Sequence, residues 1–235
     1  MENLLVNGFI KTSMLDYPGK LVSVIFLGRC NFRCGFCHNA DMVIRPDEIP
    51  RFDIESIFRY LEKKKDWMDG VCVSGGEPTL HKELPELLRK IKEIGLEVKL
   101  DSNGTNPEML KSMIEEGLID YIAMDIKTSR EKYELGAGVK VNMENIQKSI
   151  DLIKSSGVDY EFRTTIVPEV VTKEDMEKIA EWLGSDTKRY CLQQFVPMKV
   201  IEEKYYDVTP YLKGVLEEMG EIARKIIPEV EVRGV

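Results

Sequence analysis

Six short runs of apolar and β-branched residues recur along the chain, and each run ends in polar residues or glycine. Unbroken apolar runs of this length are typical of strands that are buried on both faces of a parallel sheet. They cover residues 21–28, 70–76, 96–104, 120–127, 160–168 and 190–197. A closing segment that alternates between apolar and polar residues, 229–235, predicts one more short strand.

Between these runs, apolar residues return every three or four positions, which predicts amphipathic helices packed on a sheet. Thr172 and Asp175 are spaced as a capping box and predict the start of one of these helices. The helical stripes lie at residues 54–61, 84–91, 110–114, 143–153, 176–183 and 212–219. Roughly 30 to 40 residues per strand and helix is the length of a βαβ unit, whose crossover is right-handed.

Six such units are fewer than the eight that close a barrel. We therefore expect an α/β fold, a partial and laterally open (β/α)6 TIM-like barrel of parallel strands. The expected organisation is one domain over residues 1–235. It consists of an N-terminal extension at 1–20, a barrel core at 21–197 and a C-terminal helix and short strand at 198–235.

Composition and charge argue against two classes of protein, nucleic-acid binders and membrane proteins. The formal net charge of -8 and the pI of about 5.1 argue against a nucleic-acid binder, which usually carries a basic face. No apolar run reaches the length of a membrane span, and the N-terminal residues do not resemble a signal peptide. We expect a cytoplasmic protein without a membrane partner, in which the five cysteines stay reduced.

Three of these cysteines form a CxxxCxxC cluster directly after the first predicted strand. Cys30, Cys34 and Cys37 lie within eight residues, and thiolates on one short loop favour an iron–sulfur cluster. A zinc site is the alternative, but zinc usually takes a fourth protein ligand. The adjacent His38 is poorly placed to supply it. Cys72 and Cys191 are read as ordinary buried cysteines, since they lie inside predicted strands.

Polar residues also follow the later strands, and the carboxyl ends of parallel strands share one edge of the sheet. Two glycines and a carboxylate follow the second strand, and each of these motifs also has a purely structural reading, as a turn or an ion pair. The candidate residues for ligand binding are Gly75, Gly76, Glu77, Asp101, Ser102, Asn103, Asp125 and Lys127. Asp125 and Lys127 point to the same face of their strand.

Taken together, the cysteine loop with Phe36 before its third cysteine and the later "GGEP" resemble the radical S-adenosylmethionine (SAM) enzymes. The segment from Thr12 to Val43 resembles the N-terminal region of glycyl-radical-enzyme activating proteins, of the anaerobic ribonucleotide reductase and pyruvate formate-lyase types. "DSNG", "MDIK" and "RTTIVP" extend the resemblance over most of the chain.

The resemblance implies a cofactor set and a reaction. Cys30, Cys34 and Cys37 would hold a [4Fe-4S] cluster whose fourth iron binds SAM. Reduced flavodoxin or ferredoxin would supply an electron to cleave SAM, and the resulting 5'-deoxyadenosyl radical would take a hydrogen atom from a glycine of a partner glycyl radical enzyme. The three cysteines and Lys127 would be catalytic.

The resemblance also implies which residues contact SAM. Phe36 would pack near the adenine, and His38 would belong to the same loop. Gly75, Gly76 and Glu77 would receive the methionyl ammonium. The residues around the sulfonium and carboxylate, where pyruvate formate-lyase activators also hold a monovalent cation, would be Asp101, Ser102, Asp125 and Lys127. Asn103 would also belong to the cofactor-binding residues.

Two features depart from the family pattern. Arg29 stands where these activators usually have glycine before the first cysteine, and no histidine follows the sixth strand. The stretch "QQFVPMK" lies there instead, which favours the ribonucleotide reductase type and leaves the roles of Gln193, Gln194 and Phe195 open. The alternatives are a radical SAM enzyme acting on a small molecule and a non-catalytic iron–sulfur or zinc protein.

Overall fold

The computed structural model describes residue 1 and residues 4–235. The chain folds into two compact units. Unit 1 comprises Met1–Asn31, Asp41–Ser102 and Asn106–Ala123, and unit 2 comprises Phe32–Ala40, Asn103–Thr105 and Met124–Val235. The expectation of a single domain over residues 1–235 stays a prediction. Residues 2 and 3 of the expected extension at 1–20 lie outside the described part of the chain.

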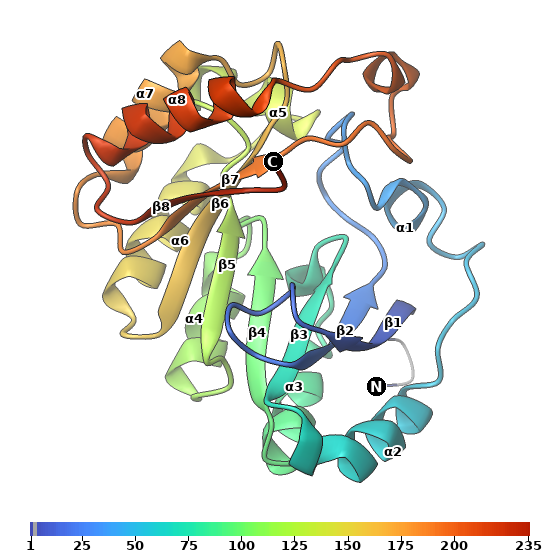
Figure 1. Ribbon diagram of the computed structural model, residues 1–235. Coiled ribbons are helices and arrows are strands. Elements are labelled where there is room, and N and C mark those ends of the chain that lie inside the picture. Colours follow the sequence, from blue (N-terminus) through green and yellow to red (C-terminus); the bar gives the residue numbers. More distant parts are fainter. Residues whose placement is uncertain (2–3) are drawn as a thin grey trace. The chain divides into compact units, whose positions relative to one another are not determined.

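Eight strands of the described residues follow one another in chain order in an open, mostly parallel sheet (Figure 1). The order is linear from β1 to β8, so the predicted α/β class with an open rather than closed sheet is confirmed. The strands are β1 (Val6–Ser13), β2 (Val22–Leu27), β3 (Gly70–Gly75), β4 (Glu97–Ser102), β5 (Tyr121–Asp125), β6 (Asp159–Ile166), β7 (Tyr190–Gln194) and β8 (Val230–Arg233).

In unit 1, β2, β3 and β4 pair in parallel, with Val22 opposite Gly70 and Gly70 opposite Glu97. β1 pairs antiparallel with β2. One buried apolar cluster of this unit contains Tyr17, Val22, Val24, Cys72, Tyr121 and Ala123. The helices of this unit are α2 (Ile54–Lys64), α3 (Leu84–Glu93) and α4 (Pro107–Glu115), and α1 (Ala40–Ile44) lies at its boundary. Helix α3 packs on β4 with Leu84, Leu87, Leu88 and Ile91 buried.

In unit 2, β6, β7 and β8 pair in parallel, with Phe162 opposite Tyr190 and Tyr190 opposite Val230. Its helices are α5 (Tyr133–Ala137), α6 (Met143–Ser155), α7 (Lys173–Leu183) and α8 (Lys213–Arg224). Helices α7 and α8 pack against each other, and α8 also packs against β7 and β8 (Figure 1). No described helix combines the length and apolar character that a membrane crossing requires.

The predicted helices and the seven predicted strands are present, each within a few residues of its expected position. The capping box is confirmed, because the Thr172 and Asp175 side chains each accept a bond from the other's backbone N–H. Among the described strands and α-helices, three were not predicted. β1 lies in the expected extension. Its pairing with β2 shifts register on both sides of Gly8–Ile10, so apolar and polar residues do not alternate regularly along it. α1 and α5 have five residues each, too few to show a helical period.

Candidate functional site

In unit 1, the chain leaves β2 through a strained turn that leads into the first cysteine of the cluster. Arg29 has a left-handed backbone (φ 68°), which is uncommon outside glycine. Its N–H donates to the Met42 carbonyl at 2.8 Å, and its carbonyl accepts from the Glu77 N–H at 2.8 Å. His81 Nε2 donates to the Gly28 carbonyl at 2.7 Å. Backbone bonds therefore join the approach to Cys30 to the loop that follows β3.

The glycine pair of that loop allows two backbones to touch. A Cβ atom on Gly75, whose φ is 129°, would lie 2.1 Å from the Leu27 carbonyl oxygen. A Cβ atom on Gly76 would lie 1.9 Å from the Arg29 carbonyl oxygen, and the Gly76 N–H donates to Leu27 O at 2.8 Å. The packing of the Cys30 approach against this loop thus requires glycine at both positions, whatever else they contact.

Glu77 and Ser102, both predicted to contact the cofactor, are brought together in this unit. The Glu77 side chain is buried, and its Oε1 accepts from Ser102 Oγ at 2.9 Å. The same oxygen accepts from the N–H and the hydroxyl of Thr79, at 3.1 Å and 2.5 Å. A buried carboxylate oxygen with several donors is held in one orientation. Thr79 is a supporting residue that no sequence motif indicated.

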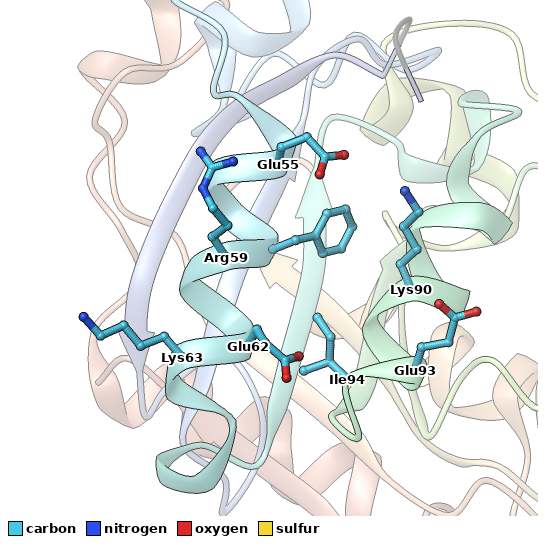
Figure 2. Close-up of a pocket in the computed structure, with 8 residues that line it drawn as sticks. Glu55, Arg59, Glu62, Lys63, Lys90, Glu93 and Ile94 are labelled. Carbon is cyan, nitrogen blue, oxygen red and sulfur yellow. The ribbon is translucent and has the colours of Figure 1, made fainter.

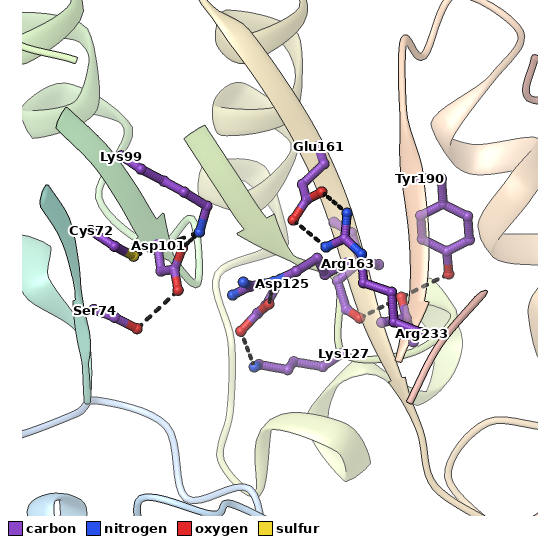
Figure 3. A network of polar contacts seen from close by, with 12 residues as sticks. Cys72, Ser74, Lys99, Asp101, Asp125, Lys127, Glu161, Arg163, Tyr190 and Arg233 are labelled. Atoms are coloured by element: carbon purple, nitrogen blue, oxygen red, sulfur yellow. Dashed lines mark hydrogen bonds and ion pairs between the residues drawn. The ribbon is translucent and has the colours of Figure 1, made fainter. Parts of the chain in front are cut away.

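Asp101 lies in a second network of unit 1, with a buried lysine (Figure 3). Its Oδ1 is ion-paired with Lys99 Nζ, and its Oδ2 accepts from Ser74 Oγ at 2.9 Å. The Lys99 side chain is only 2% exposed, and its Nζ is also 3.7 Å from Cys72 Sγ. Cys72 is buried within β3, as predicted.

In unit 2, Cys34 and Cys37 occupy one tight turn, because the Cys37 N–H donates to the Cys34 carbonyl at 3.0 Å. The turn is fastened to the end of α5, where the Arg33 N–H donates to the Ala137 carbonyl at 2.8 Å. Burial raises the pKa of the Cys34 thiol to about 11, although the positive charge of Lys127 opposes this shift. Burial also raises the pKa of Cys37, again against the charge of Lys127.

Phe36 and His38 contact the segment that follows β7 within the same unit. The buried Phe36 ring meets Tyr205 edge to face, with 5.9 Å between centroids. His38 Nε2 donates to the Val196 carbonyl at 2.6 Å, and its ring lies 6.2 Å from that of Phe195. The unassigned Phe195 is therefore buried beside the cysteine loop, and Tyr205 is a contact that no sequence motif indicated.

Asp125, the last residue of β5, and Lys127, two residues beyond it, form the ion pair expected from their spacing (Figure 3). Lys127 Nζ lies 3.0 Å from Asp125 Oδ2, and Arg163 Nε lies 3.0 Å from Asp125 Oδ1. Burial would raise the pKa of Asp125, but the charges of Arg163 and Lys127 outweigh it and hold that pKa well below its usual range. Burial disfavours the charged ammonium of Lys127 and would lower its pKa, whereas the negative charge of Asp125 favours the charged form. The net effect raises the pKa of Lys127.

Asn103 is buried, and its Oδ1 accepts from the N–H and hydroxyl of Thr105, at 3.1 Å and 2.7 Å. This is an Asx turn, the usual structural use of asparagine in a loop. Asn103 therefore stabilises its own loop, and its contact with the cofactor stays a prediction.

The cysteine loop has the donor types that an iron–sulfur cluster needs. All five cysteines are in the thiol form, and three of them lie within eight residues on one loop. Cluster iron takes thiolate ligands, so binding would release the protons that burial retains on Cys34 and Cys37. Three cysteine side chains on one loop are therefore suitable ligands for an iron–sulfur cluster. Among the described residues, no three His, Cys, Asp or Glu side chains are grouped to hold a metal ion, and the ligand set stays a prediction.

A groove of about 620 Å³ lies elsewhere in unit 1, between α2 and α3 (Figure 2). None of the predicted site residues lines it. Its walls mix acidic and basic side chains with Phe58 and Ile94, and Lys90 Nζ lies 5.4 Å from the Phe58 ring centroid. The groove is therefore separate from the residues predicted to do chemistry.

Comparison with known proteins agrees with the sequence motifs. A protein of Methanocaldococcus jannaschii named "Putative glycyl-radical enzyme activating enzyme MJ1227" is 38% identical over 97% of this chain and 95% of its own length. A Pyrococcus abyssi protein named "Probable GTP 3',8-cyclase" is 27% identical over 84% of this chain, which spans 64% of that protein.

Among solved structures, a domain of pyruvate-formate lyase-activating enzyme from Bacteroides vulgatus has a similar fold. Its TM-score is 0.57 at 19% identity, and the match covers 71% of this chain and 99% of that domain. The family model described as "Radical SAM superfamily" matches residues 24–183, more than half of the chain. The chain belongs to the radical SAM superfamily.

Proposed function

We propose that this protein is a radical SAM activase that removes a hydrogen atom from a glycine of a partner glycyl radical enzyme. One observation carries the proposal: the relative from M. jannaschii, named for that activity, aligns with nearly the whole of both chains at 38% identity. The motifs "TSMLDYPGK" and "CNFRCGFCHN", which resemble the same activators, support it independently.

In this proposal, Cys30, Cys34 and Cys37 hold the [4Fe-4S] cluster. The cluster and SAM, when bound, supply the reductive cleavage that generates the hydrogen-abstracting radical. The protein's contribution is orientation and exclusion of water. Phe36 and His38 give the cysteine loop an aromatic and hydrogen-bonded backing through Tyr205, Phe195 and Val196. Cys37 lies between Phe36 and His38 in the sequence.

The ammonium and carboxylate groups of SAM are proposed to meet the polar residues after β3, β4 and β5. Gly75, Gly76 and Glu77 would receive the ammonium, and hydrogen bonds from Thr79 and Ser102 hold the Glu77 side chain in place. Lys127 would face the carboxylate, with its Nζ donating to Asp125, whose other carboxylate oxygen accepts from Arg163. Asp101, Ser102 and Asn103 complete the set carried over from the family.

The proposal also covers the partners and the setting. The whole chain would act as one radical SAM domain, with reduced flavodoxin or ferredoxin as the electron donor. The family resemblance implies a positive charge beside Asp101 and Asp125, which pyruvate formate-lyase activators supply with a monovalent cation. A cytoplasmic and anaerobic setting would keep the thiols reduced and protect the exposed cluster iron.

A second candidate is a radical SAM enzyme that acts on a small molecule. The relative named as a GTP 3',8-cyclase favours it, since one fold with one cofactor serves many substrates. The lower identity, and the fact that the chain spans only 64% of that relative, make this the weaker candidate.

Anaerobic reconstitution followed by electron paramagnetic resonance separates the two candidates. The protein is loaded with iron and sulfide, then mixed with reductant, SAM and a candidate glycyl radical enzyme. We expect a protein-based radical on the partner together with 5'-deoxyadenosine. The matched control is a partner with its radical-site glycine changed to alanine. SAM cleavage with no radical on any candidate partner would favour the small-molecule enzyme.

A further inference from the structure

Lys99 is a buried cation next to a residue of the proposed SAM site. Its side chain is 2% exposed, and it extends from β4 on the same strand face as Asp101, two residues later. Cys72, which lies 3.7 Å from its Nζ, belongs to the apolar cluster with Tyr17, Val22 and Tyr121. An ammonium in such surroundings is costly unless an anion compensates it.

Asp101 supplies that anion, and its two oxygens have different donors. Oδ1 is ion-paired with Lys99 Nζ, and Oδ2 accepts from Ser74 Oγ at 2.9 Å (Figure 3). The Asp101 side chain is 14% exposed, so this pair is much better shielded from water than the pair of Lys92 and Asp120 in the same unit. The negative charge of Asp101 is therefore already balanced by the protein itself.

A balanced carboxylate has little need of a dissolved cation. A potassium or sodium ion that approached Asp101 would meet the Lys99 ammonium, and like charges in a shielded site repel strongly. We propose that Lys99 is a built-in counter-ion that takes the place of the monovalent cation expected beside Asp101. SAM binding by this protein is then independent of potassium and sodium. Lys99 acts as a positioning residue, and the inference rests on the proposed function.

Equilibrium binding of SAM to the reconstituted protein tests this inference. The dissociation constant is measured by anaerobic equilibrium dialysis in potassium chloride, in sodium chloride and in tetramethylammonium chloride at equal ionic strength. Tetramethylammonium is too large to coordinate a carboxylate closely. Binding requires no reductant, so no sodium dithionite enters the assay. For the wild-type protein we expect dissociation constants that agree within about twofold in the three salts.

Lys99→Met removes the charge and keeps the length of the side chain. We expect its SAM affinity in tetramethylammonium to fall by about tenfold or more, and potassium or sodium to restore it. Lys92→Met is the matched control. It removes another lysine of unit 1, whose Nζ lies 2.7 and 2.8 Å from Asp120, and it should leave the salt response flat. The melting temperature of the cluster-free Lys99→Met variant should also rise with potassium, unlike that of the wild type.

Two results would overturn the inference. One is wild-type SAM binding that tightens about tenfold when potassium replaces tetramethylammonium, a result that requires no variant. The other is a folded Lys99→Met variant that binds SAM weakly in every salt, which would make Lys99 purely structural. A wild-type protein that binds no SAM in any salt would count instead against the proposed function.

Discussion

Cys34 and Cys37 show how the surroundings of a thiol set its protonation state. Burial raises the pKa of both thiols, whereas the charge of Lys127 lowers it. The thiols are thus protonated at neutral pH in the absence of metal, which slows their reaction with oxidants and disulfides. Metal coordination must displace these protons.

Replacement of one cluster ligand should abolish SAM cleavage. Outer-shell partners of a metal typically contribute 10–100-fold, so for Cys34→Ala we expect a loss of more than about 100-fold together with lower bound iron. Cys191→Ala is the control, since Cys191 is buried inside β7 and away from the cysteine loop in sequence. Iron content and 5'-deoxyadenosine yield are measured on both variants. Full activity in Cys34→Ala would remove Cys34 from the ligand set.

At this scale, spacing predicts contacts within a strand better than contacts between strands. The two-residue period of the strand expected at 120–127 places Asp125 and Lys127 on one face, and they are bonded although β5 ends at Asp125. The same period relates Lys99 to Asp101. The sequence does not indicate Lys99 as a site residue, because it lies near the middle of its strand and not at the end. Arg163 comes from β6 and Tyr205 from the segment after β7. No spacing rule connects either residue to its partner.

Among the helices, α7 has a start that was predicted in detail. The buried Asp175 accepts from Lys132 Nζ at 2.7 Å, Ser129 Oγ at 2.9 Å and both donors of Thr172. Burial would raise the pKa of Asp175, but these hydrogen bonds outweigh it and lower the pKa to about 2. The unfolded chain has an aspartate pKa of about 3.9. This carboxylate therefore stabilises the folded state above pH 4, and the contribution is lost as the pH falls towards 2.

Asp175→Asn should lower the free energy of unfolding of the cluster-free protein by about 2 kcal/mol at pH 7. The difference from the wild type should shrink as the pH falls from about 4 towards 2, where Asp175 becomes protonated. Asp186→Asn is the control, because Asp186 makes an exposed pair with Lys154 that should contribute at most about 1 kcal/mol. Denaturant unfolding at a series of pH values gives both quantities. A constant difference across that range would contradict the assignment.

The close contact between the β2 turn and the β3 loop can be tested without any cofactor. In Gly76→Ala the new methyl group would meet the Arg29 carbonyl, a backbone atom that cannot swing away. We expect the cluster-free protein to lose about 3 kcal/mol of stability. Gly214→Ala is the control, because nothing lies within 4 Å of its added Cβ and alanine favours helix. Equal stability of Gly76→Ala and wild type in thermal melts would show that this packing is not required.

Elements with a clear period or an unbroken apolar run were predictable, and short or irregular ones were not. α3 buries four residues at helical spacing and was found from them. β1 was missed because two register shifts interrupt its pairing with β2 and leave no regular alternation. α1 and α5 are fixed by tertiary contacts such as the Arg33–Ala137 bond, which sequence spacing cannot show.

At the scale of the whole molecule, the count of strand and helix units predicted an open parallel sheet. The structure and the family match support that fold. The order of motifs along successive strand ends indicated the superfamily. What the fold does not determine is the substrate, because the chemistry of SAM cleavage is common to enzymes with very different substrates. The central claim therefore concerns where the abstracted hydrogen atom comes from.

Isotope transfer tests that claim most directly. A candidate partner is prepared with deuterated glycine and mixed anaerobically with the reconstituted protein, reductant and SAM. Mass spectrometry then measures the deuterium content of the 5'-deoxyadenosine. The account predicts one deuterium per product molecule, matched by the growth of a glycyl radical signal. Unlabelled 5'-deoxyadenosine formed alongside a partner that acquires no radical would contradict it.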